Sequence, residues 1–320
     1  MNWLKNCFLK NKWVFKLIGL IILILILAFK INFKELILAI ASIKLKYLLE
    51  TTVILSIITV VNPYRWQYIL KKLSIHYSFK KLFGFYYLTM LFGAITPART
   101  GEIISRIALL KKNAYPTDKS LVSIIVERVA DLFFLLLFVY AGALVFFRFL
   151  RLEVFLIIAI SLILIILFLI LIRKNFSRIL LEKFFLIIIP QKFKSNWRVW
   201  FKKCLENLKK FCFRDYLVIL LLTTLTWAVI FIAMNLLALG WGINTVPFFY
   251  LAISVALSNL VSLLPISISG LGTREAVLLG LLSFFNVSPE KIVSFSLSIF
   301  LINLIIICVI GLYAWLKEEI

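Results

Sequence analysis

Long continuous apolar runs dominate the sequence and constrain its fold more than any other feature. Residues 216–239 and 292–316 are the clearest examples, and each is long enough for a helix to cross a hydrocarbon core of roughly 30 Å. The runs do not alternate polar and apolar residues, as the strands of a membrane β-barrel do. With 63% hydrophobic residues and a mean hydropathy of +1.08, the chain is predicted to be an all-α polytopic membrane protein.

The positive charge is concentrated in short segments between these runs. The formal net charge is +22 at pH 7, but this clustering is typical of membrane topology and of contact with anionic lipids, not of nucleic-acid binding. The most basic segment, residues 173–214, holds twelve Lys or Arg and two Glu among aromatic and aliphatic residues. We expect amphipathic helices there that rest on an anionic cytoplasmic leaflet, and no nucleic acid as a partner.

The sequence does not indicate metal, disulfide or cofactor chemistry. The cysteines are Cys7, Cys204, Cys212 and Cys308. They show no CxxC spacing, and the single histidine, His76, lies near none of them in the sequence. Neither a metal site nor a disulfide nor a bound cofactor is therefore expected.

Six apolar segments are predicted to cross the membrane completely. They cover residues 13–29, 49–64, 120–147, 153–172, 216–239 and 292–316. Segment 33–48 mixes lysines with apolar residues and is predicted to lie in the interface as an amphipathic helix. The second crossing ends at Pro63 and Tyr64, and the following Arg65 and Trp66 form an aromatic and basic cluster that is expected at headgroup level.

Two further pairs of apolar segments are each interrupted by a break, and the arms of the first pair fall short of a full crossing. Their arms are residues 83–95 with 103–110, and residues 248–264 with 276–285. The breaks between the arms contain proline and glycine: Pro97 and Gly101 in the first, and Pro265, Gly270 and Gly272 in the second. Each pair is predicted to form a re-entrant helical hairpin, which is tolerated at membrane depth only where it is buried in protein or lines a cavity.

The order of these parts repeats in the two halves of the chain. Each half has an apolar arm, a break with Pro, Gly, Arg and Glu, a short arm and a long helix. If both hairpins return to their own side, most Lys and Arg fall on the side of the N-terminus, as the positive-inside rule requires. We therefore predict one transmembrane domain over residues 1–320, an inverted-repeat arrangement, both termini in the cytoplasm, and breaks that meet near the midplane.

Four motifs in order along the chain resemble the lysylphosphatidylglycerol synthase transmembrane-domain family of flippase-like proteins. They are Arg65-Trp66, PARTGEIISR at 97–106, ERVAD at 127–131 and LPISISGLGTREA at 264–276. The resemblance implies an inner-membrane protein that moves or binds a lipid with a charged headgroup, as in the flippase half of bacterial aminoacyl-phosphatidylglycerol proteins or in relatives linked to polyprenyl-lipid glycosylation. Ala98 stands where many relatives carry glycine. Because the sequence ends at Ile320, directly after the last span, synthase activity is not expected to carry over.

Charged residues within the apolar segments and the breaks form the candidate substrate-binding site. They are Arg99, Glu102, Arg106, Glu127, Arg128, Asp131, Arg274 and Glu275. A charge at bilayer depth costs at least ~2.5–3.5 kcal/mol by insertion scales, so these side chains are expected to face one another, a water-filled cavity or a charged ligand. Arginine offers a planar fork for phosphate oxygens, and the carboxylates are suited to a cationic headgroup group or a coupling proton.

The same residues permit another interpretation. Glu127 and Asp131 are four residues apart on one predicted helix, and the four basic side chains equal the four acidic ones in number. Such groups can pair only to hold helices together, although helices in membranes also associate through small residues and packing.

Three functions remain open from the sequence. The first is translocation of a lipid or lipid-linked headgroup. The second is an integral-membrane enzyme that acts on a phospholipid or polyprenyl lipid, with Glu127 and Asp131 as acid and base. The third is transport of a small solute or ion. The chain shows no nucleophile-base pair, no metal-ligand histidines and no nucleotide loop, so we expect the first function and no enzyme activity.

Overall fold

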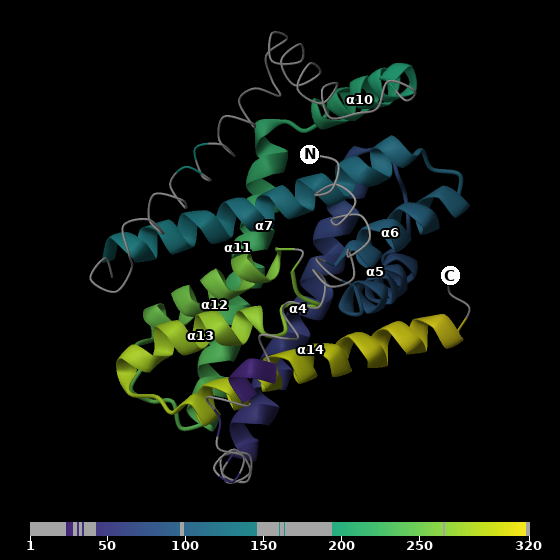
Figure 1. Ribbon diagram of the computed structural model, residues 1–320. Coiled ribbons are helices and arrows are strands. Elements are labelled where there is room, and N and C mark those ends of the chain that lie inside the picture. The colour runs from purple at the N-terminus through teal and green to yellow at the C-terminus, as the bar shows by residue number, and fades with distance from the viewer. Residues whose placement is uncertain are drawn as a thin grey trace, which may run out of the picture. The chain divides into compact units, whose positions relative to one another are not determined.

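The computed structural model describes residues 24–27, 31, 34, 43–96, 99–145, 160, 163, 194–264 and 266–317. The regular elements in these ranges are helices (Figure 1). They are α4 (Leu45–Lys72), α5 (Phe79–Ala94), α6 (Thr100–Lys112), α7 (Thr117–Val145), α10 (Lys194–Leu208), α11 (Phe213–Gly240), α12 (Phe248–Ser262), α13 (Thr273–Leu282), the 3₁₀ helix η3 (Ser283–Phe285) and α14 (Pro289–Leu316).

Three of these helices are long and apolar enough to cross a membrane. They are α4, α11 and α14, each of 28 residues, and α12 is a shorter apolar helix. The prediction of an all-helical, multi-pass membrane protein is confirmed for the described part of the chain. The number of six crossings stays a prediction, because segments 13–29 and 153–172 lie largely outside the described residues, as do Pro97, Pro265 and segment 173–193.

The chain groups into two compact units. Unit 1 comprises Met1–Val60, Phe83–Ser105 and Trp227–Ile320, and unit 2 comprises Val61–Leu82 and Arg106–Thr226. Helices α4, α6 and α11 each contribute residues to both units.

Unit 1 contains the second helical pair that the sequence predicts as a hairpin and, of the first pair, residues 83–105. Helices α12 and α13 pack side by side, and α13 also packs against α14 (Figure 1). Helices α5 and α14 approach closely through small residues, since a Cβ on Gly84 would lie 2.9 Å from the Cβ of Ala314, and one on Gly311 would lie 3.1 Å from the carbonyl oxygen of Tyr87. Such small residues let helix backbones pack tightly in membrane proteins.

The second break contacts the end of α5, directly before the first break, within unit 1. The Ser269 hydroxyl, in the second break, donates a hydrogen bond of 2.6 Å to the carbonyl oxygen of Ala94 at the end of α5. In the first break, the start of α6 lies against the end of α5, because a Cβ on Gly101 would collide with the carbonyl oxygen of Phe92. The contact agrees with the predicted meeting of the breaks, and its depth in a membrane stays a prediction.

The second break has a left-handed backbone at three of its four residues from Ser269 to Gly272. The φ angles are 50° at Ser269, 80° at Gly270 and 83° at Gly272. Glycine adopts this conformation without the steric cost that a Cβ imposes. Gly270 is also pressed against Ser262, whose Cβ would lie 2.7 Å from an added Cβ.

We expect Gly270→Ala to lower the free energy of unfolding by about 2–4 kcal/mol, because the substitution adds both backbone strain and overpacking. The matched control is Gly280→Ala in the exposed part of α13, where an added Cβ meets nothing within 4 Å. Alanine should stabilise that helix by about 0.5–1 kcal/mol. Thermal unfolding of the detergent-solubilised variants measures both effects, and equal melting temperatures would contradict the described geometry of the break.

Helix α4 corrects one expectation. The sequence predicts a crossing that ends near Tyr64, with Arg65 and Trp66 at headgroup level, but the helix continues through Pro63 to Lys72. Arg65 is 2% exposed and Trp66 is fully buried. Proline removes one backbone hydrogen bond, yet membrane helices tolerate it where neighbouring polar groups satisfy the backbone. Burial of Trp66 and the ion pairs of Arg65 favour the continued helix.

Helix α10 lies in unit 2 and is amphipathic, as predicted for this part of segment 173–214. Its apolar side, however, packs against α7, so the expectation that this side rests on the leaflet is wrong for α10. Leu205 and Leu208 are buried there, and the Asn207 amide donates a 2.7 Å hydrogen bond to Asp118 of α7. Burial, followed by the charge of Asp118, raises the pKa of the Cys204 thiol to about 12. Lys202 and Lys203 of α10 are exposed, and so are Lys209 and Lys210 directly after the helix.

Candidate functional site

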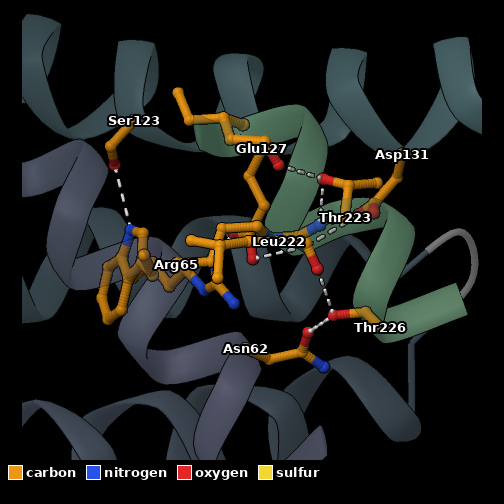
Figure 2. A network of polar contacts seen from close by, with 11 residues as sticks. Asn62, Arg65, Ser123, Glu127, Asp131, Leu222, Thr223 and Thr226 are labelled. Atoms are coloured by element: carbon orange, nitrogen blue, oxygen red, sulfur yellow. Dashed lines mark hydrogen bonds and ion pairs between the residues drawn. The ribbon is translucent and has the colours of Figure 1, made fainter. Parts of the chain in front are cut away.

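The candidate site in unit 2 is centred on Arg65, which α4 carries toward two carboxylates of α7 (Figure 2). Its Nη1 and Nη2 atoms bond Asp131 Oδ1 at 2.8 Å and Oδ2 at 3.1 Å, which forms a two-pronged ion pair. Nη2 also bonds Glu127 Oε1 at 3.1 Å, and Nη1 donates to the hydroxyl of Thr223 on α11 at 2.8 Å. Glu127 and Asp131 lie four residues apart, so one face of α7 presents both carboxylates.

Arg106 supplies the second guanidinium group of this network. Its Nη1 atom bonds the Oε2 atom of Glu127, so Glu127 bridges Arg65 and Arg106. The Arg106 guanidinium also stacks over the Trp66 ring, with 4.6 Å between Cζ and the ring centroid. The indole of Trp66 donates a 3.2 Å hydrogen bond to the hydroxyl of Ser123 (Figure 2). Indole stacking and the carboxylate together fix the orientation of Arg106.

Two threonines of α11 complete the surroundings of Arg65. Thr223 accepts from Arg65 and donates its own hydroxyl hydrogen to the carbonyl of Ile219 at 2.8 Å. One turn further on, the Thr226 hydroxyl donates toward Asn62 Oδ1, one turn before Arg65 on α4, at 3.0 Å (Figure 2). The guanidinium of Arg65 is therefore held from α7 and from α11 at once.

The network combines two guanidinium groups with two carboxylates, and most of it is removed from solvent. The side chains of Arg65, Arg106 and Glu127 are 3%, 1% and 5% exposed, whereas that of Asp131 is 23% exposed. Buried ions are tolerated when they are paired and hydrogen-bonded. This geometry offers an oriented arginine fork, which can bind phosphate or carboxylate through two parallel hydrogen bonds. The fork of Arg65 lies next to Asp131, the partly exposed member of the network.

A second cluster in unit 2 marks the start of α11. Asp215 Oδ1 accepts hydrogen bonds from the Tyr68 hydroxyl at 2.7 Å and from the Lys72 ammonium at 2.7 Å. Its Oδ2 accepts from the backbone N–H of Cys212 at 3.0 Å, so the carboxylate also caps the helix N-terminus. Its described bonds fix α4 to α11 and cap the start of α11, which are structural roles.

The charged pair of the second break lies in unit 1 and is tightly enclosed. Glu275, with no exposed surface, accepts from the backbone N–H of Gly272 at 2.5 Å, from the hydroxyl of Ser296 on α14 at 2.6 Å, and from Arg274 Nη2 at 3.2 Å. Arg274 Nε in turn donates to the Ser296 hydroxyl at 2.8 Å. These bonds hold the start of α13 to α14.

The eight residues predicted for the site are thus divided between the units. Arg106, Glu127 and Asp131 join one network in unit 2, and Arg274 pairs with Glu275 in unit 1. The remaining three are placed differently: Arg99 is exposed with φ of 54°, Glu102 is 4% exposed beside Gly93 in unit 1, and Arg128 is half-buried in unit 2.

Sequence reasoning missed Arg65, Trp66 and Thr223 as site residues. The sequence places Arg65 in a headgroup cluster because Pro63 predicts the end of the crossing. A signal was present, since two carboxylates one helical turn apart at depth need more than one cation. Thr223 carried no signal, because threonines are ordinary members of membrane helices. In the described part of the chain, no group of three or more His, Cys, Asp or Glu side chains is placed to hold a metal ion.

Comparison with known protein families gives a match over most of the chain. The family model described as the lysylphosphatidylglycerol synthase TM region matches residues 13–311. No curated protein and no solved structure matches the chain.

Proposed function

The chain belongs to the lysylphosphatidylglycerol synthase TM region family, and from this membership we propose that it translocates a lipid or lipid-linked charged headgroup between the leaflets of the inner membrane. The translocation leaves the lipid chemically unchanged. The observation that carries the proposal is the buried network of Arg65, Arg106, Glu127 and Asp131, in which an arginine fork reaches a partly exposed edge.

The cost of such a network supports a role beyond holding helices together. Taking each charge into a low-dielectric region requires desolvation that the ion pair only partly offsets, and apolar residues of similar volume often stabilise a fold as well. This chain also joins helices without charge, as Gly84 and Ala314 show between α5 and α14. Binding of a charged headgroup would explain why charged residues, and not apolar ones, occupy these positions.

The membrane itself supplies the partners. We propose that anionic membrane lipids surround the chain, that the charged headgroup of one lipid is the substrate, and that both termini lie in the cytoplasm. The exposed lysines of α10 support contact with an anionic leaflet, since each Lys near such a surface is attracted to it by about 1 kcal/mol. The orientation of the termini stays a prediction.

We expect Arg65→Lys to slow lipid translocation by at least about tenfold, because a lysine ammonium cannot reproduce a two-pronged fork. The purified variant is reconstituted in liposomes with fluorescent lipids of different headgroups, and a membrane-impermeant quencher reports movement between leaflets. Arg214→Lys, at an exposed arginine of α11, is the control and should move lipid at the wild-type rate. Melting temperatures are measured for both variants, so that a loss of fold is distinguished from a loss of translocation, and that of Arg214→Lys should stay near the wild-type value.

Each alternative predicts a different reading in the same liposomes. An enzyme changes the mass of the lipid, which mass spectrometry detects, and a solute carrier moves an aqueous tracer without moving lipid. A wild-type protein that leaves the leaflet distribution of every tested lipid unchanged would contradict the proposed function.

A further inference from the structure

The four members of the unit 2 network are not equally enclosed. Glu127 is 5% exposed and bridges both arginines, whereas Asp131 is 23% exposed and bonds Arg65. Asp131 therefore lies at the edge of the network, where its side chain is already partly exposed. Glu127, Arg65 and Arg106 have no comparable exposure.

We propose that Asp131 is an exchangeable counterion, which occupies on Arg65 the position of a headgroup phosphate and leaves it when a phosphodiester enters. This inference rests on the proposed function and deepens it by assigning the phosphate position and the charge of the group that fills it. The carboxylate bonds both terminal nitrogens of Arg65, at 2.8 and 3.1 Å. Two oxygens of a phosphate match the same fork.

Arg65 keeps its orientation while the exchange occurs. Without Asp131, Nη1 still donates to Thr223 at 2.8 Å and Nη2 still bonds Glu127 at 3.1 Å. The fork is thus oriented before the headgroup arrives, and a site that needs no reordering binds its ligand more tightly. Asp131, once turned to the edge, is also placed to meet a cationic group on the same headgroup.

Charge balance defines which phosphate fits. The ion pairs of the network join two guanidinium groups to two carboxylates, and Arg128 adds a further positive charge near Glu127. Exchange of one carboxylate for one phosphodiester leaves this balance unchanged. A phosphomonoester, whose second pKa is about 6, carries close to two charges at mildly alkaline pH and would add a negative charge that the exchanged ion pair does not match. Such a charge is costly in a desolvated site. The site should therefore select phosphodiester over phosphomonoester lipids.

The test uses the purified full chain in detergent and two lipids with identical acyl chains, phosphatidylglycerol and phosphatidic acid. Their affinities at about pH 8, where the phosphomonoester is mostly dianionic, are measured by native mass spectrometry. The wild type should bind phosphatidylglycerol more tightly. Asp131→Asn should increase that affinity on the order of tenfold, because the lipid no longer displaces a charge-assisted ion pair.

Two control variants isolate the role of the carboxylate. Asp118→Asn removes another buried acid of α7, which pairs with Asn207 outside the network, and should leave lipid affinity unchanged. Asp131→Glu keeps the negative charge and should therefore lack the gain in phosphatidylglycerol affinity that Asp131→Asn shows. An unchanged or reduced affinity of Asp131→Asn would overturn the proposal. A wild type that prefers phosphatidic acid would also overturn it, and this comparison needs no variant to fold.

The outcomes separate this inference from the proposed function. If the wild type moves lipid in liposomes but Asp131→Asn gains no affinity, the exchange is refuted and translocation stands. If the wild type moves no lipid while Asp131→Asn gains affinity for phosphatidylglycerol, the phosphate position stands and translocation is refuted.

Discussion

Glu127→Gln is expected to lower the free energy of unfolding by roughly 3–5 kcal/mol, the cost of leaving a buried ion without its partner. Glu127 accepts from Arg65 at 3.1 Å and from Arg106, and its side chain is 5% exposed. The neutral amide presents one oxygen, so one arginine loses its acceptor and faces an NH₂ donor. Unfolding of the purified protein in mixed detergent micelles, followed by tryptophan fluorescence, measures the loss.

A second substitution should recover much of that loss. In Glu127→Gln/Arg106→Gln the network retains Arg65 with Asp131, which again balances in charge. Glu50→Gln is the control, because the Lys46–Glu50 pair of α4 spans 3.9 Å with side chains 78% and 40% exposed, and such a surface pair is worth at most about 1 kcal/mol. If Glu127→Gln is as stable as Glu50→Gln, Glu127 does not bridge the two buried arginines as described above.

Glu275→Gln should have a comparable effect, also roughly 3–5 kcal/mol, because it breaks a fully enclosed pair. The carboxylate of Glu275 accepts from Gly272, Ser296 and Arg274, and an amide at this position cannot accept from all three donors. Thermal unfolding in detergent measures the loss, and Glu275→Gln/Arg274→Met should regain most of it by removing the unpaired cation.

Translocation by the doubly substituted protein decides the role of this pair. If Arg274 and Glu275 only hold α13 to α14, the refolded double variant moves lipid at the wild-type rate in liposomes. If they bind the headgroup, stability returns in the double variant while translocation does not. The same comparison at Glu127 and Arg106 should give recovered stability without translocation, since those residues belong to the proposed site.

Helix positions could be predicted where hydropathy alone determines them. The apolar runs at 216–239 and 292–316 correspond to α11 (Phe213–Gly240) and α14 (Pro289–Leu316), because polar, glycine or proline residues bound each run. The end of α4 could not be predicted in this way. Its last turns are stabilised by tertiary contacts of Arg65 and Trp66, and a local rule that stops a helix at Pro63 ignores them.

The candidate site was harder to predict than the helices, for a related reason. The sequence shows that Arg106, Glu127 and Asp131 are charges in apolar surroundings, but it does not show which helices adjoin. Arg65 meets Glu127 across 62 positions and Thr223 across 158. Helix α10 shows the same difficulty, since its amphipathic pattern indicates an apolar partner without distinguishing a lipid leaflet from α7.

The hydrogen bond between Ser269 and Ala94 has a consequence for the hydration of this region. The carbonyl of Ala94 ends α5, where a helix leaves its last carbonyls without intrahelical donors, and the Ser269 hydroxyl supplies a donor at 2.6 Å. In lipid, a carbonyl deprived of its donor costs several kcal/mol. If this contact lies at membrane depth, its separation is expected to require a water molecule that replaces the hydroxyl as donor to the carbonyl.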